Sequence, residues 1–306
     1  MKKWILAVVF ALTVFFSLVT AVLVAGCTFV IDEGEVEAVP LRVSFIDVGQ
    51  GLAVLLEYGG RFALYDTGPD SVGVIDSLVA RGVDTLEWVV MSHSHRDHAG
   101  GILELGGAAG SVWAGNAPRV HVRHLYVGPD TAGGFVRDSV LGLARRFDIP
   151  VDTLYRGDMC EQISGDGDAP RFNALWPPDY VHEGGNPASV VLRAEFGAAS
   201  MLLTGDLDSA GERRLLELSP TLSADLLQVP HHGSAGSSSL RFIAQVAPDY
   251  AVASVGAGNS YGHPREEVVR KYGYVLGDTA RFFRTDRDGT VEFELWPDIG
   301  VVTGRD

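Results

Sequence analysis

The chain has 306 residues, of which 46% are hydrophobic and 21% charged, and its formal net charge at pH 7 is −15. This composition excludes a disordered or collagen-like chain and is sufficient for a large buried core. The excess of acidic residues argues against non-specific nucleic-acid binding, which depends on Lys and Arg. An acidic chain can still contain a local basic cleft. Two cysteines are too few for a disulfide framework or a cysteine-built zinc site.

The first 27 residues resemble a targeting segment. Lys2 and Lys3 precede an uncharged stretch over 4–26 that is long enough to span a bilayer, and acidic residues follow it. The stretch ends in Leu-Val-Ala-Gly before Cys27, which resembles a bacterial lipobox whose cysteine is lipidated after cleavage. The alternative is an uncleaved anchor helix with an incidental cysteine. Either way, we expect an acidic linker over 28–40 and a membrane-anchored, extracytoplasmic protein.

From residue 41 to residue 306 we predict one domain in which strands and helices alternate. Period-two alternation and short apolar runs predict strands at 41–48, 53–58, 61–65, 86–91, 190–196, 200–204, 224–229 and 250–255. Helical spacing of apolar residues predicts helices at 71–81, 135–147, 210–218 and 240–246. The chain end predicts a hairpin of 281–284 with 290–296, turned at Asp288-Gly289. Strands with interspersed helices favour a layered α/β fold.

The strongest chemical signal follows the strand predicted at 86–91. Four potential metal ligands lie within six residues of one another: His93, His95, Asp97 and His98. His93 and His95 alternate on an extended segment, so their side chains can point the same way. Asp97 and His98 follow in the turn and can face a neighbouring metal position. Imidazole and carboxylate groups suit zinc, manganese or iron, and two such ions about 3.5–4 Å apart form a hydrolytic arrangement.

This cluster and several other segments resemble the metallo-β-lactamase superfamily. The H-x-H-x-D-H run is similar to its signature, Asp66-Thr67-Gly68 to its first motif, and Thr204-Gly205-Asp206 to its metal-bridging aspartate. More narrowly, F-I-D-V-G-Q-G from Phe45 and V-P-H-H-G-S from Val229 are similar to segments of the ComEC competence proteins' hydrolase domain, in the same order. The resemblance implies a four-layer αββα sandwich over 41–306 and two divalent metal ions, Zn or Mn.

The resemblance also assigns the metal ligands. One ion would be held by His93 and His95, the other by Asp97 and His98, with Asp206 between them. A carboxylate suits that bridge because it has two oxygens; the alternative for Asp206 is a helix N-cap, since a helix is predicted after it.

One of His231 and His232 should complete the second position. We expect His232 to be the ligand and His231 to face the substrate. Asp66 would orient ligands, or would be only a turn-forming aspartate before Gly68. Asn186 and Ser234 are expected near the ligands or the substrate, and His263, in a Tyr-Gly-His-Pro turn, would be a general acid, a phosphate contact or a structural loop histidine.

One departure concerns the first ion. Many hydrolases of the superfamily have another histidine between the signature and the bridging aspartate. That region offers His121 and His124, which lie in a strand-like run and are expected to be structural, and His182 in a Gly-rich turn. We therefore expect a ligand-poor first position, held by His93, His95, Asp206 and water, with a loosely bound ion.

The predicted chemistry is hydrolysis. A water that bridges two divalent ions has a lowered pKa and becomes a nucleophile near neutral pH, and His231 or His263 could neutralise the leaving group. With Asp97, they are the candidate catalytic residues. We predict a metal-dependent phosphodiesterase or nuclease, with DNA as a possible substrate. The alternatives are an esterase acting on envelope phosphodiesters or another ester, and a non-catalytic tethered binding subunit. The presence of every matched ligand favours catalysis, because scaffold descendants of a fold usually lose them. The sequence does not specify the oligomeric state.

Overall fold

A computed structural model describes residues 38–70, 72–106, 120–129, 134–164, 169–180, 184–219 and 221–303. Ala38 begins a compact unit that contains all of these residues. The predicted lipobox, the anchor segment and most of the linker lie outside the described residues. Within the described ranges, no helix combines the length and the apolar character needed to cross a membrane.

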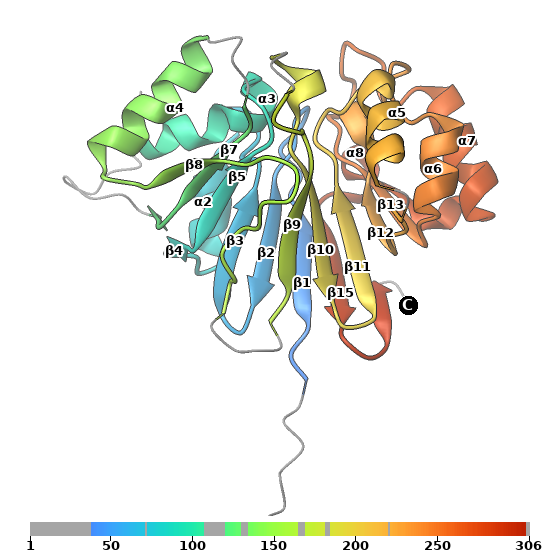
Figure 1. Cartoon of the computed structure of the whole chain (residues 1–306), viewed down its shortest axis with the longest axis horizontal. Coiled ribbons are helices and arrows are strands. Elements are labelled where there is room, and N and C mark those ends of the chain that lie inside the picture. Colours follow the sequence, from blue (N-terminus) through green and yellow to red (C-terminus); the bar gives the residue numbers. More distant parts are fainter. Residues whose placement is uncertain are drawn as a thin grey trace, which may run out of the picture. The chain divides into compact units, whose positions relative to one another are not determined.

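Two mixed sheets form the centre of this unit (Figure 1). The first sheet has the strand order β16-β15-β1-β2-β3-β5-β7-β8. Its strands are β1 Leu41–Phe45, β2 Val54–Tyr58, β3 Arg61–Tyr65, β5 Trp88–Met91, β7 Leu125–Val127, β8 Val151–Thr153, β15 Val291–Trp296 and β16 Gly300–Thr303. Pairing is antiparallel from β16 to β3 and parallel from β3 to β8.

The second sheet has the order β14-β13-β12-β11-β10-β9. Its strands are β9 Arg171–Trp176, β10 Val191–Phe196, β11 Ala199–Leu203, β12 Leu226–Gln228, β13 Tyr250–Ala253 and β14 Phe282–Arg284. Strands β9 to β11 are antiparallel, and β11 to β14 are parallel. A separate short pair joins β4 Thr85–Leu86 to β6 His121–Val122.

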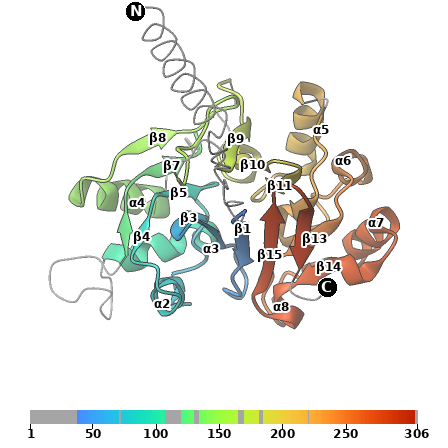
Figure 2. The same cartoon turned by 90° about the horizontal axis from the view of Figure 1, so that it is seen from below.

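Helices lie on the outer faces of the two sheets (Figures 1 and 2). The first sheet carries α2 Val74–Ala80 and α4 Phe135–Arg146, and the second carries α5 Ser209–Leu218, α6 Leu240–Val246 and α7 Glu266–Leu276. The shorter turns are α3 Arg96–Ala99, η1 Gly100–Gly106, η2 Asn186–Ala188, η3 Pro230–Gly233, η4 Thr279–Arg281 and α8 Thr285–Asp288. The layers therefore follow the order α, β, β, α, which confirms the predicted four-layer sandwich.

The main core lies between the two sheets. Trp88 of β5 packs edge-on against Phe172 of β9 at 5.1 Å between ring centroids, and Phe283 of β14 meets Phe293 of β15 at 5.4 Å. Such aromatic pairs add to the free energy gained from burying apolar area. Cys160 belongs to the same cluster as a free thiol, and burial raises its pKa well above the ordinary value.

The predicted C-terminal hairpin is wrong. Strand β14 pairs with β13 in the second sheet, whereas β15 pairs with β1 in the first. The Thr285 hydroxyl anchors the chain between them, because it accepts a hydrogen bond from the Val255 amide and donates one to the Val255 carbonyl. The two strands thus meet through side chains across the core and not through backbone pairing. Strand β3 and helix α6 have the predicted ends, and the other predicted elements are present with shifted ends, whereas β8, β9, β16 and α7 were not predicted.

Candidate metal centre

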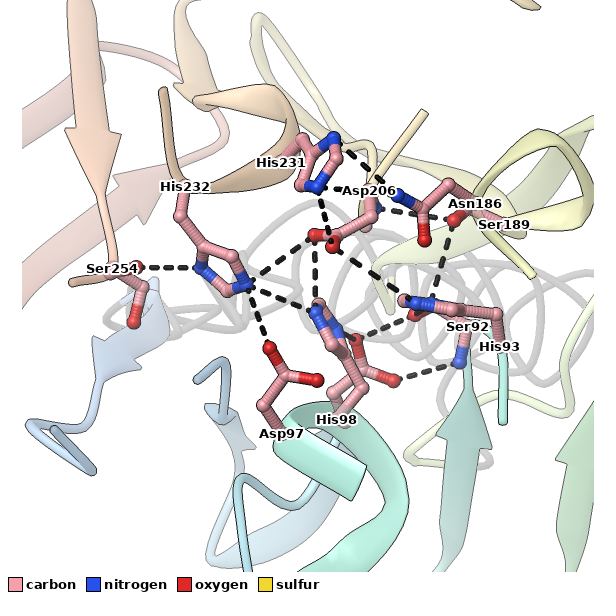
Figure 3. A network of polar contacts seen from close by, with 12 residues as sticks. Ser92, His93, Asp97, His98, Asn186, Ser189, Asp206, His231, His232 and Ser254 are labelled. Carbon is pink, nitrogen blue, oxygen red and sulfur yellow. Dashed lines mark hydrogen bonds and ion pairs between the residues drawn. The ribbon is translucent and has the colours of Figure 1, made fainter. Parts of the chain in front are cut away.

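The predicted ligands gather where parallel strands of both sheets end. Asp66 follows β3, the signature histidines follow β5, Asp206 follows β11, and the His231-His232 pair follows β12. The carboxyl ends of parallel strands point to one edge of a sheet, and this edge is where ligands bind in α/β folds. Figure 3 shows the side chains converging from these loops.

Asp206 lies at the middle of the cluster. Its Oδ1 is 3.0 Å from His98 Nε2 and 3.4 Å from His232 Nε2. Its Oδ2 is 3.6 Å from His231 Nε2 and 4.0 Å from His93 Nε2. Burial opposes ionisation of this carboxyl, but the imidazoles of His98 and His232 hold its pKa well below the usual range. Each oxygen of an ionised carboxylate therefore faces a different pair of histidines.

The alternative role of Asp206 as a helix cap is wrong. Helix α5 begins after Asp208, and the Asp208 carboxylate accepts the hydrogen bond from the Gly211 amide that caps this end. Asp206 is 2% exposed and lies in the turn before it. Its carboxylate is consequently directed to the histidines.

Asp97, His98 and His232 form one compact donor group. His98 Nδ1 donates to Asp66 Oδ2 at 2.7 Å, and His232 Nδ1 donates to the Ser254 carbonyl at 2.7 Å. The two Nε2 atoms then face each other at 3.1 Å. In neutral rings both atoms carry lone pairs, so a proton or a cation must lie beside them. Ligand atoms bonded tetrahedrally to one zinc ion lie about 3.3 Å apart, so this spacing fits a metal.

The pKa shifts of this donor group also fit a bound cation. Burial lowers the pKa of His98, but the carboxylates of Asp206 and Asp66 outweigh burial and raise it above the ordinary value. Asp97 lies 3.5 Å from His232 Nε2, and despite its burial this imidazole and that of His98 lower the pKa of its carboxyl. The cluster thus attracts positive charge.

A further group overlaps this one and corresponds to the first metal position; it consists of His93, His98 and Asp206. His93 Nδ1 is 3.0 Å from Ser92 Oγ, which donates its own hydrogen to Asp66 Oδ2 at 2.7 Å. His93 Nδ1 therefore carries the ring hydrogen, and Nε2 presents a lone pair. That atom is buried without a hydrogen-bond partner among the described residues. Burial also lowers the pKa of His93, so its ring is neutral and free to bind a cation.

His95 occupies a less central place than expected. Its ring contacts the His93 ring at 4.5 Å between centroids, but its side chain is exposed. It belongs to neither compact donor group of the described chain. The structure thus places His95 at the side of the first position.

His231 and His263 line the open side of the centre. His231 has a 26% exposed side chain, and Asn186 Nδ2 lies 3.1 Å from its Nε2. The His263 ring lies 6.0 Å from the His231 ring and stacks on Tyr261 at 5.6 Å. Burial and the neighbouring histidines lower the pKa of His263 to about 4, so its ring is neutral at pH 7.

The remaining predicted residues lie elsewhere. The Ser234 hydroxyl accepts a hydrogen bond from the Gly236 amide within its own turn. His121 is exposed in β6, and His124 is structural as predicted, because it pairs with Asp152 at 2.9 Å and stacks on the Tyr126 ring. His182 lies outside the described residues.

Two supporting groups were missed by the sequence analysis. Ser92 links His93 to Asp66, and its position inside the signature, at the end of β5, could have identified it. Ser254 contributes only its backbone carbonyl to His232, and a carbonyl has no sequence signal. Both groups select the ring nitrogen that faces the metal position.

Asp66→Asn is expected to weaken binding of the more tightly held divalent ion by about 10–100-fold. The carboxylate holds His98 Nδ1 and both the amide and the hydroxyl of Ser92, so a neutral amide would misalign that network. Calorimetric titration of the metal-free chain with Mn²⁺ measures the effect. Asp70→Asn is the control, because Asp70 pairs with the exposed Arg96 in the same region. Unchanged affinity in Asp66→Asn would contradict the prediction.

Comparisons with known proteins agree with the geometry. The model of the metallo-beta-lactamase superfamily matches residues 46–257. Competence protein ComA of Neisseria gonorrhoeae is 35% identical over 85% of this chain and 33% of its own length. ComE operon protein 3 of Bacillus subtilis is 30% identical over 88% of this chain and 34% of its own length. The chain therefore spans about a third of the length of these relatives.

A solved structure shows the same fold. The metallo-beta-lactamase fold protein YhfI from Bacillus subtilis superimposes with a TM-score of 0.50 and 16% identity. The match covers 80% of this chain and 95% of YhfI.

Proposed function

Since this chain belongs to the metallo-beta-lactamase superfamily, we propose that it is a metal-dependent phosphodiesterase that cleaves DNA outside the cytoplasm. The observation that carries this proposal is the arrangement of Asp206, whose two carboxylate oxygens each face a separate pair of imidazoles. Donor atoms that remain unpaired in a buried cluster fit two divalent ions, Zn or Mn.

The side chains of the centre would have different roles in hydrolysis. Bound divalent ions would supply Lewis acidity and a water of lowered pKa. Asp97 and Asp206 remain ionised and hold positive charge at the site, while Asp66 keeps His98 oriented. His231 is partly exposed next to this cluster, and burial lowers its pKa so that the ring is neutral. It is therefore placed to exchange a proton with a substrate oxygen.

The choice of a phosphodiester rests on charge and on the relatives. The chain has a net charge of −15, but bound metal ions can supply local positive charge at the reacting phosphate. An exposed cation, Arg265, lies beside His263 near the open side, and its charge contributes to the lowered pKa of that ring. Similarity to part of two competence proteins supports DNA as the substrate. Lipidation of Cys27, or an uncleaved anchor over 4–26, would tether the chain to the membrane.

The full chain is expected to hydrolyse bis(p-nitrophenyl) phosphate and linear DNA in the presence of Zn²⁺ or Mn²⁺, and a chelator is expected to abolish both activities. The two substrates share the phosphodiester but differ in everything around it. Cleavage of the small diester alone would contradict the nuclease assignment and point to an envelope phosphodiester. Absence of both activities in a chain with bound metal would reject the phosphodiesterase and favour another ester or a binding subunit.

A further inference from the structure

Unpaired acceptor atoms are concentrated on one side of Asp206. His93 Nε2 and Asn186 Oδ1 are buried and have no hydrogen-bond partner among the described residues. Asp206 Oδ2 faces the same side, 4.0 Å from His93 Nε2 and 3.6 Å from the Nε2 of His231, the ring that Asn186 contacts. Amide and carboxylate oxygens can only accept, and His93 Nε2 does the same because the hydrogen of this ring is on Nδ1. Buried acceptors without donors are unfavourable, and a cation between them would satisfy all three.

The short turn η2 holds Asn186 beside the cluster, and its backbone is closed by the Ser189 amide, which donates to the Asn186 carbonyl at 3.1 Å. Ser189, at the end of η2, accepts a hydrogen bond from the Asp206 amide at 3.1 Å, and its hydroxyl lies 3.4 Å from His93 Nδ1. The Asn186 Nδ2 atom lies 3.1 Å from His231 Nε2, which leaves Oδ1 as the free atom of the amide. Figure 3 shows Asn186 beside Asp206, between His231 and Ser189. The turn therefore carries an oxygen ligand to the edge of the first donor group.

The first group needs such a donor more than the second. The two groups share His98. If His98 serves the second group with Asp97 and His232, the first retains only His93 and Asp206. His95 is exposed beside it, and His124 is engaged with Asp152. We propose that Asn186 Oδ1 is a direct ligand of the first metal ion, and that this oxygen shifts the first position toward Mn²⁺ relative to Zn²⁺.

The metal preference follows from ligand chemistry. Carbonyl oxygens suit Mn²⁺ and Mg²⁺, whereas imidazole suits Zn²⁺. The second position combines the Asp97 carboxylate with two imidazoles from His98 and His232, so it accepts either metal. The first position, with an amide oxygen in place of a further imidazole, discriminates between them. This inference rests on the metal dependence of the proposed function and is independent of its substrate.

The test is a metal titration without substrate. The full chain, freed of metal by a chelator, is titrated with Mn²⁺, and free Mn²⁺ is followed by its electron paramagnetic resonance signal. The wild type is expected to bind two ions and Asn186→Ala only one tightly, with the affinity of the lost ion lowered at least about tenfold. Asn186→Asp keeps an oxygen and is expected to retain both ions. Asn173→Ala, a second amide truncation in β9, is the control and should bind two.

A second experiment tests whether an added imidazole increases the preference for zinc. Asn186→His is expected to keep two ions and to raise the Zn²⁺ to Mn²⁺ occupancy ratio of one position at least about tenfold in competition. Two Mn²⁺ ions of unchanged affinity in Asn186→Ala, loss of both ions, or a single ion in the wild type would each overturn the proposal. Failure of hydrolysis alone would reject only the proposed function, because binding is measured without substrate. Circular dichroism confirms that each variant is folded.

Discussion

Asp206→Ala is expected to lower the turnover of bis(p-nitrophenyl) phosphate by about 10³-fold or more. Asp206 is the one described side chain whose two oxygens approach the imidazoles of both donor groups. Its removal takes away the negative charge between His98 and His232 and leaves these buried rings beside each other without a shared anion. Both metal positions should therefore weaken together, unlike the single position affected by Asn186→Ala.

The measurement pairs kcat with metal content in the same preparations. Asp208→Ala is the matched control, because Asp208 lies two residues away and caps α5 through the Gly211 amide. That variant should lose about 1 kcal/mol of the free energy of unfolding and keep its kcat and its metal. Full activity in Asp206→Ala would refute the assignment of the bridging carboxylate.

Gly101→Ala is expected to destabilise the chain by about 3 kcal/mol and to weaken metal binding. Gly101 lies in η1, the turn that follows the helix of His98, and packs against the loop that carries Asp66. A Cβ at this position would lie 2.1 Å from the Thr67 carbonyl oxygen and 2.6 Å from Val74 Cγ1. A backbone hydrogen bond joins the loop after Asp66 to the turn after His98, since the Gly101 amide donates to the Gly68 carbonyl at 2.8 Å. A methyl group must therefore separate Asp66 from His98.

The control for this substitution is another helical glycine. Gly142 lies in α4, and a Cβ there would meet no atom within 4 Å. Gly142→Ala should raise the free energy of unfolding by about 0.5–1 kcal/mol, because alanine is the better helix former. Denaturant unfolding in the presence of a chelator separates packing from metal loss. A Gly101→Ala variant as stable as the wild type would show that the close approach is not required.

Much of the candidate site could be predicted from local sequence. Strand β3 was located at its observed ends, 61–65, because an apolar run between glycines and a loop is a local pattern. Helix α6 was likewise placed at 240–246. The cluster of His93, His95, Asp97 and His98 was recognisable because it follows such a strand, where loops carry ligand-binding groups. Asp206 and the His231-His232 pair were identified through the family resemblance. By contrast, β8 and β16 escaped prediction because they are short edge strands that pair on one side only.

By itself, the sequence determined the donor types, their places at strand ends and the layered fold, because spacing and periodicity are properties of neighbouring residues. Only the tertiary structure decided the contacts between distant residues. It placed β14 and β15 in different sheets, since Phe283 and Phe293 meet across the core. It directed His232 toward Asp97 through the Ser254 carbonyl and left His95 exposed. These outcomes depend on packing between segments far apart in the chain, which no local pattern encodes.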